Sequence, residues 1–153
     1  MPAESSWPLP AATAFTGELS LRFVIGDLMR DADEFVYSWA NALDEEEARR
    51  LYDTFHVPGS GIALVQMGNA NLNPWTEAKA NTKNPDRGPL LITDGEKDHT
   101  VPWAIADAAY KRQRRNPAVT EIVKMLDRGH SLTIDHAWPE VAQTALDFVK
   151  RCA

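Results

Sequence analysis

A carboxylate and a histidine follow two short apolar runs in the second half of the chain. Asp98 comes after residues 90–93 (LLIT), and His130 comes after residues 120–125 (TEIVKM). Side chains in the loops that follow neighbouring parallel strands lie close together, because the carboxyl ends of those strands meet at one edge of the sheet. A carboxylate that bonds an imidazole fixes its tautomer and stabilises the imidazolium formed during proton transfer. The pattern therefore predicts an acid–base pair made of Asp98 and His130.

The elements that must position this pair alternate between strand and helix. Residues 90–93 are continuously apolar, as in a strand buried in a parallel sheet, and residues 120–125 predict a second strand. Pro102 begins a helix that ends at Pro117, and a last helix starts near Pro139. Such a strand–helix–strand unit is parallel and right-handed. The residues expected to face inward are Ile105, Ala106, Ala109 and Tyr110 in the first helix, and Val141, Ala142, Ala145, Phe148 and Val149 in the last.

The first half is predicted to be mainly helical. Apolar residues recur at helical spacing from Val36 through Trp39 and Ala40 to Leu43, after a possible N-cap at Asp33. Asp44 and Glu47 have capping-box spacing and open a second helix, whose buried stripe is expected at Ala48, Leu51, Tyr52 and Phe55.

Weaker patterns flank these helices. Residues 1–14 indicate a flexible arm, and residues 19–25 alternate like a strand, although they could also begin a helix. Residues 62–70 favour a short helix, and residues 69–86 are the candidate boundary. We expect one compact unit with two parts: a mainly helical segment over residues 1–86, and an α/β segment over residues 87–153.

Composition narrows the function. A net charge of −6 argues against nucleic-acid binding, and no apolar stretch reaches the about 18 residues that span a bilayer. The single Cys152 excludes an intramolecular disulfide, which suits a cytoplasmic location. His99, His130 and His136, with the nearby Asp94, Glu96 and Asp98, lack a zinc-ligand spacing, so we expect neither metal nor cofactor.

These residues resemble a known family. LLITDGEKDHTVP, followed by DRGHSLTIDHAWPEVAQTALDFVKR, is similar to the C-terminal portion of esterase-like α/β-hydrolase-fold enzymes. The acid loop G-x-x-D-x-x-V-P and the G-H-S loop are both present, and ANALDEEEARRLYDTFHVPGSG with NANLNPWTEAK resembles the cap region. The resemblance spans roughly residues 35–153. It implies a partial α/β-hydrolase-like fold with a cap-like first half, in which Asp98 is the triad acid and His130 the triad base of ester hydrolysis.

The nucleophile of that family does not carry over. Its serine sits in a G-x-S-x-G turn between a strand and a helix, and no serine here has that context. Ser60 in P-G-S-G and Ser131 beside His130 are the remaining candidates, and the H-G-G-type oxyanion loop is missing as well. Trp75, Trp103 and Trp138 could line a substrate pocket or pack in the core.

Four interpretations stay open. The chain is a fragment or shortened relative, one part of a two-chain enzyme, an enzyme that uses another nucleophile or water, or a non-catalytic binding module. Its partners would be a small ester and further copies of itself, because a sheet of two or three strands leaves an edge and an apolar face open. We therefore expect a homodimer or a higher oligomer.

Overall fold

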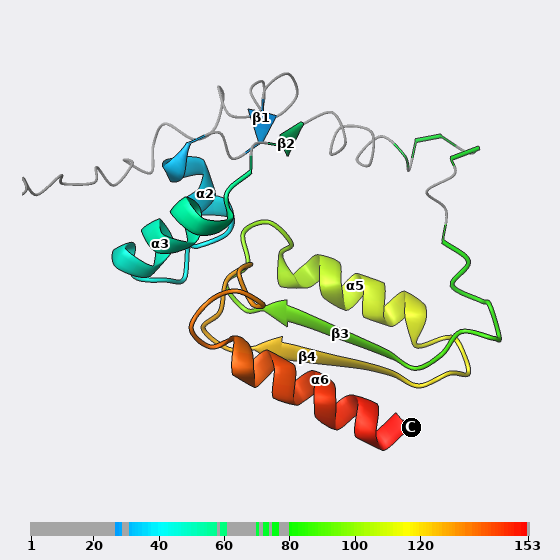
Figure 1. Cartoon of the computed structure of the whole chain (residues 1–153). Helices are drawn as coiled ribbons and strands as arrows, with labels where there is room; N and C mark the ends of the chain where they lie inside the picture. The colour runs from blue at the N-terminus through cyan, green and yellow to red at the C-terminus, as the bar shows by residue number, and fades with distance from the viewer. Residues whose placement is uncertain are drawn as a thin grey trace, which may run out of the picture.

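A two-stranded parallel sheet between two helices forms the centre of the structure (Figure 1). The computed structural model describes residues 27–28, 31–57, 59–60, 70, 72–73, 75–76 and 80–152. The elements are β1 (Asp27–Leu28), α2 (Ala32–Ser38), α3 (Glu45–Phe55), β2 (Gly59–Ser60), β3 (Leu90–Gly95), α5 (Trp103–Gln113), β4 (Thr120–Met125) and α6 (Trp138–Cys152).

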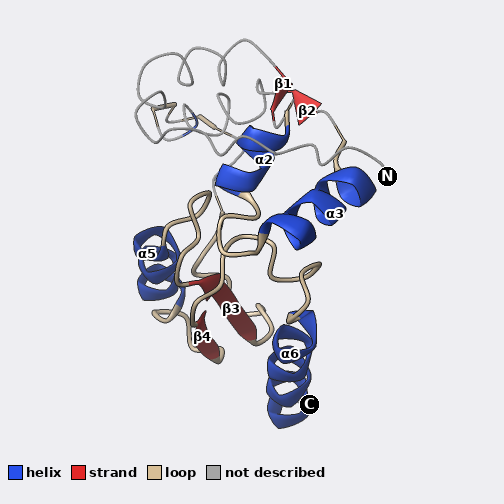
Figure 2. Ribbon diagram, turned by 90° about the vertical axis from the view of Figure 1, so that its left-hand side faces the viewer, coloured by secondary structure: helices blue, strands red, loops and turns tan. Residues whose placement is uncertain are grey.

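The parallel pair β3–β4 confirms the predicted α/β class. The pairing is in register from Leu90 opposite Thr120 to Gly95 opposite Met125, so both strands end at one edge. β3 is two residues longer than the apolar run, because Asp94 and Gly95 continue the pairing. Helix α5 covers one face of the sheet and α6 the other, while α2 and α3 lie beyond the carboxyl ends of the strands (Figures 1 and 2).

The helices of this half start close to the predicted prolines, but the expected inward faces are only partly buried. Ala106, Val141 and Phe148 are buried, whereas Ile105 and Val149 are each 58% exposed. The physical reason is the width of the sheet. Two strands about 5 Å apart cannot cover the whole apolar stripe of a helix. The other expected inward residues that are exposed are Ala109, Ala142 and Ala145.

Helix α2 differs from the prediction at both ends. Its N-cap is Asp31, whose side chain accepts a hydrogen bond from the backbone N–H of Glu34 at 3.0 Å, and not Asp33. The helix ends at Ser38, so Trp39 and the apolar positions after it continue into a turn. The apolar spacing is the same in a helix and in a helix followed by a tight turn, which is why it did not locate this end.

Helix α3 begins after the predicted N-cap, Asp44. The side chain of Asp44 accepts from the N–H of Glu47 at 2.8 Å. Ala48 and Leu51 are buried together with Phe35, whereas Phe55 is 53% exposed and lies outside this cluster. Ile134, from the loop after β4, packs against the same cluster, so the helical half and the α/β half share apolar contacts.

Several predictions fall outside the described residues. The arm at residues 1–14 and the possible strand at residues 19–25 lie there, as does nearly all of the helix expected at residues 62–70. In the part of the chain that is described, no helix is both long enough and apolar enough to cross a bilayer.

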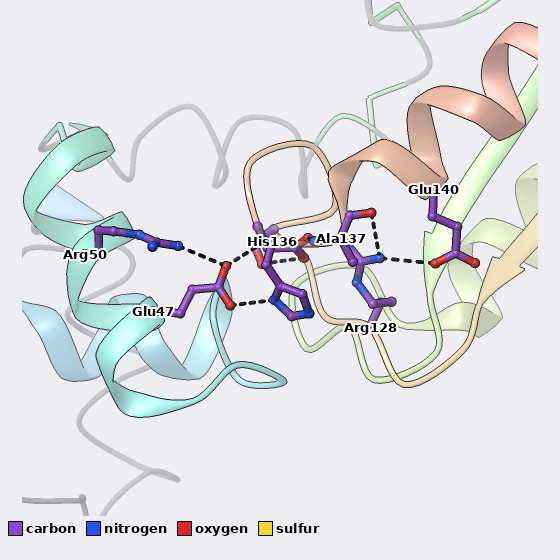
Figure 3. Close-up of polar contacts among 8 residues, drawn as sticks. Glu47, Arg50, Arg128, His136, Ala137 and Glu140 are labelled. Carbon is purple, nitrogen blue, oxygen red and sulfur yellow. Dashed lines mark hydrogen bonds and ion pairs between the residues drawn. The ribbon is translucent and has the colours of Figure 1, made fainter.

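A buried carboxylate joins α3 to the loop after β4 (Figure 3). Glu47 is 7% exposed, and its two oxygens accept from the backbone N–H of His136 at 2.6 Å and from the His136 ring Nδ1 at 2.5 Å. Arg50 lies 3.4 Å from the same carboxylate. Both Glu47 oxygens are thus used in holding the two halves together.

Glu47→Ala should lower the free energy of unfolding by about 2 kcal/mol, because the N–H and ring of His136 lose their partner. Urea unfolding monitored by circular dichroism measures the change. Glu46→Ala is the control, since Glu46 is an exposed neighbour in the same helical turn, and it should cost less than about 1 kcal/mol. Equal losses would show that Glu47 acts only as a helix-terminal charge.

Candidate functional site

Asp98 and His130 meet at the carboxyl ends of β3 and β4. Asp98 Oδ2 lies 2.7 Å from His130 Nδ1, which is hydrogen-bonding distance. The Asp98 side chain is 3% exposed and that of His130 is 24% exposed. With Nδ1 directed to the carboxylate, the Nε2 atom is the one available for proton exchange. The geometry is that of a carboxylate-oriented imidazole.

Local hydrogen bonds fix the carboxylate of Asp98. Its Oδ1 atom accepts from the backbone N–H groups of Thr100 at 2.7 Å and Val101 at 2.8 Å. A short loop before a helix favours this arrangement, because an aspartate can satisfy the free N–H groups there. The Oδ2 atom is left to face His130.

The loops that follow β3 and β4 also hold each other by their backbones. The N–H of Glu96 donates to the carbonyl of Met125 at 2.9 Å, and that of Lys97 donates to the carbonyl of Arg128 at 2.8 Å. A Cβ atom at Gly95 would overlap the Gly129 carbonyl oxygen and lie 2.5 Å from the Arg128 carbonyl oxygen. Glycine at residue 95 therefore permits the approach that brings Asp98 to His130.

The turn after α2 supports both loops from the helical half. The side-chain amide of Asn41 donates to the Lys97 carbonyl at 2.7 Å, and the N–H of Ser131 donates to the Trp39 carbonyl at 3.1 Å. The Trp39 and His130 rings are edge-to-face, with centroids 4.5 Å apart and planes at 88°. Trp39 thus limits the orientation of the imidazole.

The role of Trp39 and Asn41 was not predicted from the sequence. The helical spacing indicated only a core position for Trp39, and Asn41 carried no signal of its own. Their contacts cross more than fifty positions of the chain, as between Asn41 and Lys97. No local pattern reports such a contact.

A buried ion pair shapes the loop that carries His130. Arg128 bonds Asp135, and both side chains are almost fully buried. Arg128 also donates to the Ala137 carbonyl at 3.2 Å and lies 3.5 Å from Glu140 of α6 (Figure 3). The pair closes the loop upon itself, which fixes the backbone on either side of residue 130.

Ser131 is not positioned as a nucleophile. It is 1% exposed, and its hydroxyl donates to Asp135 Oδ2 at 3.3 Å. The backbone of Ser60 lies in β2, paired with Asp27 of β1. In both views this pair of strands lies near α2 and apart from the carboxyl ends of β3 and β4 (Figures 1 and 2). Neither serine is brought to the acid–base pair.

A groove of about 390 Å³ opens beside the acid–base pair, and Asp98 and His130 both line it. Its other walls come from β3, α5 and the loop after His130. The pocket residues predicted from the sequence lie elsewhere. Trp75 is 86% exposed and Trp138 is 53% exposed, while Trp103 lies under the Lys124 ammonium at 4.4 Å. The side chains that line the groove from β3 and α5 are Ile92, Thr93, Asp94, Ile105, Ala106 and Ala109.

Asp94 is a second carboxyl group in the groove. It is 4% exposed, and its Oδ2 atom has no hydrogen-bond partner among the described residues. Burial, and then the negative charge of Asp98, raise the pKa of Asp94 to about 6. A neutral Asp94 can donate a hydrogen bond to a neighbouring carboxylate, whereas two charged carboxylates repel each other.

Comparison of the chain with protein-family models, with curated proteins and with solved structures gave no match.

Gly95→Ala should separate the two loops, because the added methyl group overlaps backbone atoms that cannot rotate away. We expect a loss of about 2 kcal/mol or more in unfolding free energy, measured by urea unfolding. Gly88→Ala is the matched control, since a Cβ there meets nothing within 4 Å. A Gly95→Ala protein as stable as the control would contradict the close approach.

Asp94→Asn should stabilise the protein near neutral pH. The pKa of Asp94 is higher in the folded chain than the ordinary 3.8. The folded state therefore holds the proton more tightly, and stability declines as pH rises from about 4 to about 6. Relative to wild type, the variant should gain about 2 kcal/mol between pH 4 and pH 7. Urea unfolding at several pH values measures the gain, and a pH-independent difference would contradict it. Asp86→Asn, at an exposed position, is the control.

Proposed function

We propose that the chain contributes an acid–base pair to carboxylic-ester hydrolysis. His130 is the general base and Asp98 the carboxylate that orients it. The observation that carries the proposal is the 2.7 Å hydrogen bond between buried Asp98 Oδ2 and His130 Nδ1, at the edge of an open groove. The resemblance of both loops to those of esterase-like α/β-hydrolase-fold enzymes supports the same roles.

The chemistry needs little more than His130 Nε2 and an attacking hydroxyl. Nε2 removes the proton as the oxygen attacks the ester carbonyl, and Asp98 stabilises the imidazolium that forms. The imidazolium then returns the proton to the departing alkoxide as the tetrahedral intermediate collapses. When water attacks, the products are an acid and an alcohol; when a serine attacks, the alcohol leaves first and water releases the acid from the acyl-serine in a second cycle. The attacking hydroxyl belongs to water or to a serine supplied by another chain, since neither candidate serine lies at the pair.

The open groove also supports a second, non-catalytic function. Ile105 lines the groove and is 58% exposed, and each strand of the β3–β4 sheet has one partner within that sheet. Among the described residues the outer edges of both strands are unpaired, and such an edge next to exposed apolar side chains favours association with another chain. The alternative is therefore an interaction module that assembles as a homodimer or a higher oligomer, in which Asp98 and His130 are structural.

Hydrolysis of p-nitrophenyl acetate and butyrate separates the two functions. If His130 is the base, His130→Ala should lower the rate at least tenfold, and Asp98→Asn should also lower it because the tautomer is no longer fixed. The release of p-nitrophenolate is followed by absorbance.

His99→Ala is the control for this assay. His99 is an exposed histidine next to Asp98, and its Nδ1 atom lies 3.0 Å from the Tyr37 carbonyl and not against Asp98. The substitution should change the wild-type rate by less than about twofold, because an exposed imidazole catalyses ester hydrolysis no better than free imidazole does in solution. Equal, near-background rates for wild type and His130→Ala would contradict the enzymatic function and favour the interaction module.

A further inference from the structure

The groove beside the acid–base pair lies along the outer edge of β3. Its lining includes three successive residues of that strand, Ile92, Thr93 and Asp94, and none of its lining residues in the described part of the chain belongs to β4. One edge of β3 pairs with β4, and its other edge has no partner among the described residues. The groove therefore borders backbone that no described strand covers.

The hydrogen bonds of β3 show which backbone groups point away from β4. At Leu90, and again just after the strand at Glu96, the N–H donates across to the β4 side at 2.9 Å. In a parallel pair, alternate residues direct both their N–H and their C=O to the same neighbouring strand. The even-numbered residues from 90 to 96 therefore bond toward β4, and the odd-numbered ones direct these groups outward. Thr93 is the odd-numbered residue that lines the groove, so its N–H and C=O face the open edge.

Helix α5 forms one wall of the groove with apolar side chains that the two-stranded sheet leaves uncovered. Ile105 is 58% exposed, Ala109 is exposed as well, and both line the groove. A strand added beside β3 would lie about 5 Å from it, and every second side chain would point toward α5. Apolar side chains at those positions would cover Ile105 and Ala109.

The charge of the groove favours a basic occupant. Asp94 and Asp98 both line it, and none of its described lining residues is a lysine or an arginine. Lys124, which is opposite Asp94 in the strand register, lies over the Trp103 ring at 4.4 Å instead. A cleft lined by one sign of charge attracts the opposite charge beyond contact distance.

A second copy of the chain fits this edge poorly. If residues 92–94 of two copies paired with each other, the Asp94 and Asp98 carboxyls of both copies would lie in one shared groove. Like charges that are brought together disfavour association. The outer edge of β4 therefore suits a homodimer better, and the edge of β3 is left for a different polypeptide.

We propose that the groove binds an extended segment of a different polypeptide, which adds a strand beside β3. Its backbone pairs with the N–H and C=O of Thr93, its apolar side chains cover α5, and a lysine or arginine lies toward the carboxyl end of β3. The bound segment would cover the His130 ring, which lines the same groove. Binding requires none of the ester chemistry proposed for His130.

Two six-residue peptides, the length of β3, are the probes. Both alternate valine with threonine and are capped at both ends, and one carries a lysine where the other carries a glutamate. Titration of the full chain at neutral pH, followed by ¹H–¹⁵N NMR, should shift the Thr93 amide signal and slow its hydrogen exchange. The lysine peptide should bind about fivefold more tightly than the glutamate peptide.

Thr93→Pro tests the backbone pairing. It removes an N–H that the β3–β4 pairing does not use, and proline is tolerated at such edge positions. Binding of the lysine peptide, measured by isothermal titration calorimetry, should weaken about tenfold, because the segment loses a hydrogen bond and meets the proline ring. Thr93→Val keeps the N–H, so it is the matched control and should bind like wild type.

Ala109→Trp tests the location without altering the strand. Ala108 and Ala109 are both exposed on α5, and of the two only Ala109 lines the groove. A tryptophan at residue 109 should fill the groove and reduce peptide binding at least about tenfold. Ala108→Trp is the matched control and should leave the affinity unchanged.

Three results would each overturn the proposal: no shift at Thr93 with either peptide, equal affinity in Thr93→Pro and Thr93→Val, or equal affinity in Ala109→Trp and Ala108→Trp. Slow exchange of the Thr93 amide in the peptide-free chain, lost on dilution, would overturn it too and assign the edge to a second copy. Equal binding of the lysine and glutamate peptides would overturn the preference for a basic segment.

Peptide binding is measured without turnover. Failure of His130-dependent hydrolysis therefore leaves the binding result in place, and failure of peptide binding leaves the ester assay unaffected.

Discussion

The backbone contact between the loops that follow β3 and β4 is the constraint on which the candidate site depends. The in-register parallel pairing ends at Gly95 opposite Met125, and the chains then stay close enough for Lys97 to bond Arg128. A side chain at Gly95 would fill the space that the Gly129 carbonyl occupies. With the two backbones in contact, one hydrogen bond suffices to join Asp98 to His130.

The helical half completes the site by polar contacts with those loops. Glu47 of α3 receives the backbone and ring of His136, and Asn41 binds the carbonyl of Lys97. Trp39 lies against the His130 ring. The contact with His136 pairs the buried Glu47 carboxylate, and Asn41 adds a further hydrogen bond between the two halves. The position of the helical half therefore follows from hydrogen bonding as well as from apolar packing.

Two carboxyl groups, those of Asp98 and Asp94, line the groove together with the His130 ring. Asp98 is fixed by two N–H groups and His130, while Asp94 lies nearby with one oxygen unpaired among the described residues. The raised pKa of Asp94 keeps it partly neutral around pH 6. A neutral Asp94 adds no second negative charge beside the carboxylate that bonds the His130 ring.

The sequence by itself determined the main secondary-structure elements and the two residues of the acid–base pair. The apolar runs identify β3 and β4, Asp44 identifies the start of α3, and the acid and histidine loops identify Asp98 and His130. These signals are local, and they arise from periodicity and capping. Only the tertiary structure decided that Ser131 is turned to Asp135, that Trp75 and Trp138 are exposed, and that Trp39 borders His130. Those outcomes depend on how close distant segments approach, which periodicity does not encode.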